Sequence, residues 1–134
     1  MYVDKYLTVM DSTALTADSV STNSVNLGSA KDLTYGKQLY LVTVIDTQLV
    51  SAGTDTSLNI QVVTDTTDTL ATPTIQCQTG EIEEADLTAN RAKIVLPVVM
   101  PAGTEEQYLG ARFEVGTEGD FTAGAITSFF TFDP

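Results

Sequence analysis

Apolar and polar residues alternate with a period of two along several stretches of the chain, which is the pattern of a β-strand. The clearest stretch runs from Gln38 to Asp46 and has apolar residues on both faces, as is typical of a central strand that is covered on both sides. Ser57 to Val63 alternates Leu58, Ile60 and Val62 with Asn59 and Gln61, which predicts a strand with one face in water. Gln107 to Val115 alternates as cleanly, with Arg112 and Glu114 opposite its apolar face.

Shorter or less regular stretches predict the remaining strands. They are Tyr2 to Val9, Val20 to Leu27, Thr74 to Gln78, Arg91 to Val99 and Ala125 to Phe132. Pro97 lies within the fourth of these and cannot donate a ladder hydrogen bond, so we expect that strand at a sheet edge or a bulge. Clusters of turn-forming residues separate the stretches, as in hairpins and Greek-key connections.

Length and composition turn this set of strands into a fold prediction. The chain has 134 residues, enough for one domain with a core and too few for two. With 13 Val, 6 Ile and 22 Thr it is rich in β-branched residues, which suit a pleated sheet better than a helix. About eight strands predict an all-β, single-domain antiparallel β-sandwich of the jelly-roll type over residues 1–134. An immunoglobulin-like sandwich is the nearest alternative.

Two segments between the strands have an unusual composition. Gly80 to Asn90 gathers acidic residues around Ile82 and Leu87, and we expect either one helical turn or an acidic loop there. Thr64 to Thr72 is rich in threonine and low in complexity, which predicts an exposed loop.

The balance of charge excludes several classes of partner. With 18 acidic and 6 basic residues the formal net charge is −12, and a surface of that sign repels nucleic-acid phosphates and anionic lipids. We therefore expect neither a nucleic-acid nor a membrane partner. No stretch approaches 18 consecutive apolar residues, and Asp4 and Lys5 stand where a secretory signal is apolar. The sequence thus predicts folding in a reducing cytoplasm.

Candidate catalytic and metal-binding residues are few. The chain has no histidine, and its one cysteine, Cys77, is expected to be a small buried hydrophobe. Glu83 and Glu84 are adjacent, but neighbours on an extended chain point to opposite sides and do not form a catalytic pair. Asp65 and Asp68 lack the ligand spacing of an EF-hand, which leaves only a weak calcium site open. We expect no enzyme activity and no cofactor.

The final strand carries aromatic rings on both of its faces. Phe129 and Phe130 point to opposite sides, and Phe132 follows on the side of Phe130. A sandwich has a core on only one face of each sheet, so the second face needs another cover. Two covers stay open at this point: a partner subunit, or a loop of the same chain.

Segments along nearly the whole chain share their order and spacing with a known family. In the first part of the chain they are Met1 to Thr8, Asp11, Ala14 to Ala17, Ser21 to Asn23 and Asn26 to Gly28. Further along they are Gly36 to Asp46, Ser51 to Gly53, Tyr108 with Leu109, and Phe121 to Gly124. In these segments the chain resembles the capsid cement proteins of tailed bacteriophages. The resemblance is weakest over Gly80 to Arg91 and Phe129 to Pro134.

The resemblance implies a jelly-roll domain that acts as a structural virion protein, without catalysis. Such a protein binds the outer surface of an HK97-type phage capsid, bridges neighbouring capsomers and stabilises the shell. The implied partner is the phage major capsid protein, and the implied location is the outer capsid surface of the virion, after synthesis in the host cytoplasm. The alternative function is that of a carbohydrate-binding β-sandwich module on a virion or a cell surface.

The first expected contact lies at the N-terminus. Residues 1–11 are expected to include an arm that lies on a capsid subunit or pairs with its sheet edge. The arm residues assigned to this interface are Tyr2, Asp4, Lys5 and Tyr6.

The second expected contact is a self-contact through the last strand. Phe129, Phe130 and Phe132 are expected to meet a second copy around a two-fold axis, with a trimer as the alternative. The acidic segment Glu81 to Asp86 is expected either to face solvent or to meet a basic patch on the capsid.

Overall fold

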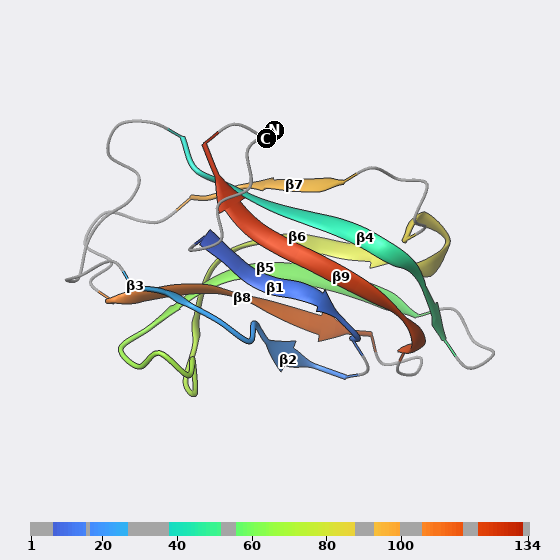
Figure 1. Cartoon of the computed structure of the whole chain (residues 1–134), viewed down its shortest axis with the longest axis horizontal. Helices are drawn as coiled ribbons and strands as arrows, with labels where there is room; N and C mark the ends of the chain where they lie inside the picture. The colour runs from blue at the N-terminus through green and yellow to red at the C-terminus, as the bar shows by residue number, and fades with distance from the viewer. Residues whose placement is uncertain are drawn as a thin grey trace.

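The chain folds into two β-sheets that pack face to face (Figure 1). The computed structural model describes residues 7–15, 17–26, 38–51, 56–87, 93–99, 106–116 and 121–132. Its elements are β1 (Thr8–Thr13), β2 (Ser19–Val20), β3 (Val25–Asn26), β4 (Tyr40–Ser51), β5 (Ser57–Asp65), β6 (Thr74–Glu83), the 3₁₀ turn η2 (Glu84–Asp86), β7 (Ile94–Pro97), β8 (Tyr108–Val115) and β9 (Phe121–Thr131). No α-helix occurs within these ranges.

The order of the strands defines a jelly roll. Sheet A has the order β1-β9-β4-β7, and sheet B has the order β2-β8-β5-β6, with β3 also paired to β8. Because β2 and β3 share one position beside β8, the nine strands fill eight positions. The antiparallel pairs β1·β9, β2/β3·β8, β4·β7 and β5·β6 are nested in sequence and alternate between the sheets. This winding is that of the jelly roll, and it confirms the β-sandwich predicted from the sequence.

Three of the predicted strands lie where the apolar pattern placed them. β4 runs between β9 and β7 in sheet A, and β8 runs between β2 and β5 in sheet B with Leu109, Ala111, Phe113 and Val115 all buried. β7 is an edge strand of sheet A, as Pro97 requires.

The strand predicted over Val20 to Leu27 is instead divided into β2 and β3. Between them, Ser21 Oγ donates a hydrogen bond to the carbonyl oxygen of Asn23 at 2.8 Å and accepts one from the Ala111 N–H at 3.2 Å. A serine hydroxyl competes with the ladder in this way and interrupts a strand. The prediction of one continuous strand is therefore wrong.

The core lies between the two sheets and contains the inward-facing side chains of both. Its aromatic members are Phe113 of β8 with Phe121 and Phe130 of β9. Leu and Ile side chains from the other strands, among them Leu41 of β4 and Ile60 of β5, fill the space around these rings. Each such side chain contributes about 1.5–3 kcal/mol when it leaves water, so this layer is the main source of stability.

The outer face of β5 departs from the prediction. Gln61 and Val63 point away from the core, yet they are 1% and 0% exposed. Leu70 folds back from the following turn onto Gly110, where a Cβ would lie 2.4 Å from the Leu70 Cδ1 atom. Since Gly110 pairs with Val63, Leu70 shields this part of the sheet. The strand predicted over Ser57 to Val63 is confirmed as β5. The expectation that one of its faces lies in water is wrong for Gln61 and Val63, because the neighbouring side chains and the turn cover them.

An irregularity in the pairing of β9 with β4 depends on a glycine. The register shifts between Thr47 and Val50, and opposite this point Gly124 has a φ of +114°. A Cβ at Gly124 would lie 2.6 Å from the Gln48 carbonyl oxygen and 2.7 Å from the Leu49 Cα. Both the backbone conformation and the close approach of β4 therefore require glycine here.

Gly124→Ala is expected to lower the free energy of unfolding by about 2–4 kcal/mol, because it combines backbone strain with a steric clash. Gly80 is the matched control: it has a φ of +80° and nothing within 4 Å of a built Cβ. Gly80→Ala thus carries backbone strain alone and is expected to cost about 1–2 kcal/mol. Urea denaturation of both variants measures the difference. Equal losses would contradict the steric requirement at Gly124.

Candidate functional site

The structure describes only part of the expected N-terminal arm. Tyr2, Asp4, Lys5 and Tyr6 lie outside the described residues. Residues Thr8 to Thr13 form β1, which pairs with β9 and buries Val9. The portion of residues 1–11 from Thr8 onward therefore belongs to sheet A and not to an arm.

The three phenylalanines near the end of the chain differ widely in exposure. Phe130 points into the core and Phe129 onto the outer face of sheet A, and each is 1% exposed. Phe132 follows the strand and is 48% exposed. The cover that Phe129 needs is thus provided within the chain, and neither buried ring has surface to offer a partner. Of the three phenylalanines expected to contact a second copy, only Phe132 is exposed enough to do so.

The backbone of β9 is also unavailable to a partner strand. β9 lies between β1 and β4 in sheet A, so both of its edges carry ladder hydrogen bonds. Of the three phenylalanines assigned to a self-contact, only Phe132, just after the end of β9, has an exposed side chain.

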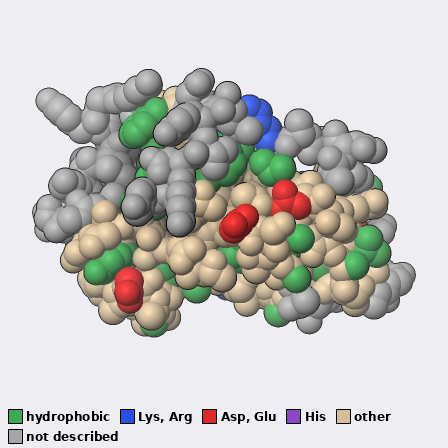
Figure 2. Space-filling view, in the orientation of Figure 1, with side chains coloured by type: hydrophobic (Ala, Val, Ile, Leu, Met, Phe, Trp, Pro, Cys, Tyr) green, Lys and Arg blue, Asp and Glu red, His purple; other side chains and the backbone are tan. Residues whose placement is uncertain are grey.

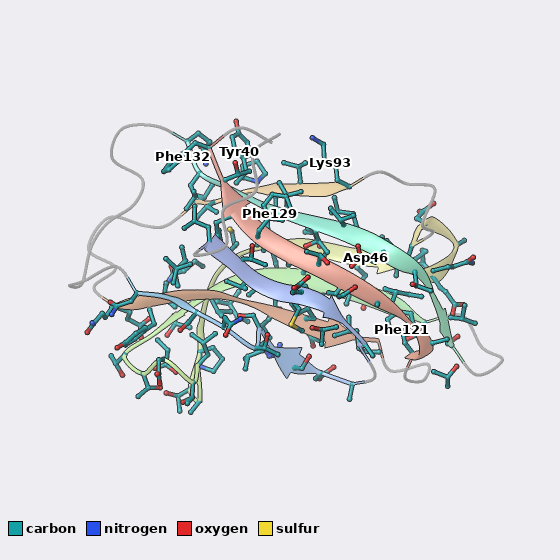
Figure 3. The ribbon with its side chains drawn as sticks, viewed as in Figure 1. Tyr40, Asp46, Lys93, Phe121, Phe129 and Phe132 are labelled. Atoms are coloured by element: carbon teal, nitrogen blue, oxygen red, sulfur yellow. The ribbon has the colours of Figure 1, made fainter. Side chains whose placement is uncertain are left out.

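Apolar side chains do reach solvent along β7 and at the end of sheet A where β4 begins and β9 ends. Every second residue along β7 enters the core, which leaves Val95, Pro97 and Val99 pointing outward. Tyr40 pairs with Pro97 on one side and with the residue before Phe132 on the other. Figure 3 shows Tyr40 and Phe132 together where β4 begins and β9 ends. We name these five residues the β7 patch.

The β7 patch differs in charge from most of the surface. None of its five residues is acidic, in a chain with a net charge of −12. Lys93 precedes β7 and is exposed, and Figure 3 shows it at the start of that strand. Figure 2 shows hydrophobic side chains at the surface in the upper part of the same view, beside a cationic side chain, with isolated carboxylates below. An apolar surface with a cation at its margin is therefore a candidate contact site.

Hydrogen bonds hold the backbone beneath the β7 patch in place. Gln38 Nε2 donates to the carbonyl oxygens of Leu39 at 2.7 Å and Val98 at 2.9 Å. Cys77 of β6 lies on the other side, with its sulfur 3.6 Å from the Pro97 carbonyl oxygen and 3.5 Å from the backbone nitrogen two residues further on. Burial raises the pKa of the Cys77 thiol, so the thiol stays protonated and serves as a structural contact between the sheets.

The centre of the outer face of sheet B is polar, and its polar side chains bind one another. Gln61 Nε2 donates to Gln78 Oε1 at 3.0 Å and to Glu114 Oε2 at 3.2 Å, while Gln61 Oε1 accepts a hydrogen bond from Arg112 Nη1 at 3.0 Å. Arg112 also forms ion pairs with Asp18 at 3.8 Å and with Glu114 at 3.6 Å. These groups bind one another, so the part of this face around Gln61 and Arg112 has little unmet hydrogen-bonding capacity to offer a protein partner.

The acidic segment Glu81 to Asp86 divides between strand and turn. Glu81 and Glu83 are exposed on β6, whereas the Glu84 carboxylate accepts a hydrogen bond from the Ser51 N–H. The backbone N–H of Glu84 in turn donates to the Thr56 carbonyl oxygen at 3.0 Å. Glu84 thus fixes the end of β6 against the end of β4, and only part of the segment is open to solvent.

Neither a cluster of candidate metal ligands nor a membrane-spanning helix is found within the described ranges. They hold no group of three or more His, Cys, Asp or Glu side chains placed to share an ion. None of their helical segments has the length and hydrophobicity to cross a bilayer.

Asp65 organises the turn between β5 and β6. Its Oδ2 accepts the Thr72 N–H at 2.8 Å, and its Oδ1 accepts the N–H groups of Thr66 at 2.6 Å and Thr67 at 3.4 Å. The bond from Thr72 is the main reason that the pKa of Asp65 lies below its usual value. Both carboxylate oxygens of Asp65 therefore accept hydrogen bonds. Of the loop expected to be exposed over Thr64 to Thr72, only the stretch from Thr66 to Thr69 is exposed without interruption.

Most of the β7 patch was not among the site residues predicted from the sequence. Val95, Pro97 and Val99 were predicted only as part of a strand, and Tyr40 only as part of a doubly covered strand. The signal was present, because Ile94, Leu96 and Val98 mark the core side and leave the alternate residues outside.

Comparison with models of known protein families finds a match over most of the chain. The model of the family described as Bbp16 matches residues 9–130, which is most of the chain. The chain belongs to the Bbp16 family. A comparison of this Bbp16-family chain with curated proteins finds no match.

Asp65→Asn is expected to reduce the free energy of unfolding at pH 7, because it removes the charge that the three N–H groups stabilise. The folded-state pKa of Asp65 lies below its unfolded value. The stabilisation is therefore present above about pH 4 and is lost as the pH falls through the lowered folded-state pKa. Urea denaturation across this range should show the wild type converging on the variant at low pH. Asp68→Asn, in the same turn, is the control. A constant difference between wild type and Asp65→Asn would contradict the assignment.

Proposed function

We propose that this protein is a structural virion protein that binds the outer surface of a tailed-phage capsid, bridges neighbouring capsomers and stabilises the shell. The proposed partner is the phage major capsid protein, and the proposed contact surface is the β7 patch. The observation that carries the proposal is the exposed apolar surface of the β7 patch, whose backbone is held by hydrogen bonds. Elsewhere on the outer face of sheet A, the chain itself covers the ring of Phe129.

The resemblance described above supplies the identity of the partner. It extends over nearly the full chain and links the sequence to capsid cement proteins. A jelly-roll fold agrees with that resemblance, and the polar residues of sheet B leave sheet A as the better candidate for contact with protein.

The physical role is to add interface area where subunits meet. A stable protein interface buries about 1,600 Å² in total, which is more than five side chains supply, so the β7 patch would be the apolar centre of a larger contact with a polar margin. The net charge of −12 keeps free copies apart in solution. An attachment of modest strength, repeated over many symmetric sites, would resist the separation of the shell.

Cosedimentation with purified phage capsids that lack this protein tests the proposal directly. We expect saturable binding at a fixed ratio to the major capsid protein, followed by a higher temperature of shell disruption. Failure to bind the cognate capsids would overturn the proposed function.

Val99→Glu is expected to weaken capsid binding at least about tenfold, or about 1.4 kcal/mol, because it places a carboxylate at the centre of the contact. Val99 is 57% exposed, so the substitution leaves the core intact. Val50→Glu is the matched control: Val50 is 42% exposed and lies near the opposite end of β4 from Tyr40. Sedimentation binding curves compare the two variants. Wild-type affinity for Val99→Glu would remove the β7 patch from the contact, even if the unmodified protein binds capsids.

A further inference from the structure

A hollow of about 350 Å³ lies on sheet B, away from the β7 patch. Its lining residues are Thr22, Asn23, Ser24, Asn26, Asp68 and Tyr108. They come from the connection between β2 and β3, from β3 itself, from the turn after β5 and from the start of β8 (Figure 1). Tyr108 precedes the inward-facing Leu109, so it lies on the outer face of the sheet. The hollow is thus a surface site assembled from three stretches that lie far apart in the sequence.

Hydrogen bonds between these segments fix the walls of the hollow. Ser24 Oγ donates to the Asp68 carbonyl oxygen at 2.9 Å, which ties the β2–β3 connection to the β5–β6 turn. Gln107 Nε2 donates to Asn26 Oδ1 at 3.0 Å, which ties β3 to the start of β8. The Asn23 N–H donates to the Val9 carbonyl oxygen at 3.0 Å. A site held in this way loses little entropy when a ligand binds.

Three polar groups in the lining have no partner within the described chain. They are the side-chain amide of Asn23, the carboxylate of Asp68 and the hydroxyl of Tyr108. The other polar side chains that line the hollow are engaged: Ser24 with Asp68, Asn26 with Gln107, and Thr22 with Val9. The hollow therefore presents one amide, one carboxylate and one phenol to whatever enters it.

The chemistry of the lining excludes several ligand classes. The Asp68 carboxylate and the net charge of −12 repel a phosphate or another anion. One carboxylate is too few for a calcium ion, which takes six to eight oxygen ligands with several carboxylates among them. Five of the six lining residues are polar, which does not suit an apolar ligand. An uncharged molecule rich in hydroxyl groups suits a lining whose available groups are one amide, one carboxylate and one phenol.

We propose that this hollow binds a neutral carbohydrate of mono- or disaccharide size. Asp68 and Asn23 would accept and donate hydrogen bonds to sugar hydroxyls, and the Tyr108 ring would pack against the C–H face of the sugar ring. A volume of about 350 Å³ is near the lower end of the range for small-molecule sites and fits such a ligand. This activity goes beyond the proposed capsid contact and does not depend on it, because the two surfaces share no residue.

The test uses the full-length protein labelled with ¹⁵N. A bacterial glycan array selects sugars, and amide shifts are then followed during titration with those sugars and with glucose, galactose, mannose and N-acetylglucosamine. We expect shifts confined to the backbone around Asn23, Asp68 and Tyr108. Asp68→Asn and Tyr108→Leu are each expected to weaken binding at least tenfold, and Tyr108→Phe, which keeps the ring, is expected to weaken it less.

Matched substitutions elsewhere separate a binding effect from a general one. Asp11→Ala removes an exposed carboxylate on β1, and Tyr40→Leu removes a half-buried tyrosine on sheet A. Both are expected to leave sugar binding unchanged. A blank array with no shift for the four monosaccharides overturns the proposal, as do shifts that lie away from the hollow. If Tyr108→Leu fails to fold, the exposed Asp68→Asn decides the outcome. Capsid cosedimentation of Asp68→Asn should remain normal, so failure here is distinct from failure of the proposed function.

Discussion

β4 and β9 pair along almost their whole length, from Tyr40 opposite Thr131 to Ser51 opposite Phe121. Next to the Tyr40 end, this pair is apolar on both sides. Leu41 and Phe130 meet on the inner side and enter the core, while Val42 and Phe129 meet on the outer side. A sheet that is apolar on both faces must be covered twice. Sheet B covers the inner face, and the chain also covers Val42 and Phe129. That second cover stops short of β7, so the exposed β7 patch is the margin of the same outer apolar surface.

Sheet B meets the same requirement by different means. Its central strand β5 has Gln61 and Val63 on the outer face, and both are buried. Gln61 is enclosed by hydrogen bonds from Arg112 and to Gln78 and Glu114, and Val63 is shielded beside Gly110 by Leu70 from the next turn. The polar groups satisfy one another and the apolar group is capped locally, so this face needs no partner. The asymmetry between the sheets is the physical reason why a protein contact is better placed on sheet A.

Alternation along the chain predicted the strands well because each strand buries one face in a common core. It predicted β4 and β8 correctly. It also predicted the edge position of β7, because Pro97 has no N–H to donate to a neighbouring strand. It failed where a side chain contacts residues outside its own strand. Ser21 donates to Asn23 and accepts from Ala111 of β8, which divides a strand, and Leu70 reaches Gly110 and shields the outer side of β5. Alternation could not predict that Phe129 is buried, because its burial depends on which other parts of the chain cover the outer face of sheet A. Residues that form surfaces, such as Tyr40 and Tyr108, are brought to their neighbours only by strand order.

The jelly roll also determines how the two proposed surfaces relate to each other. The β7 patch is at the margin of sheet A, and the hollow at Tyr108 is on the outer face of sheet B. The outer faces of the two layers of a sandwich point in opposite directions. A protein seated on a shell through sheet A would therefore leave the hollow facing away from the shell, where a soluble or cell-surface glycan has access. Because the core between the layers is close-packed and resists deformation, either surface can be occupied without rebuilding the other, so the two binding activities are expected to be independent.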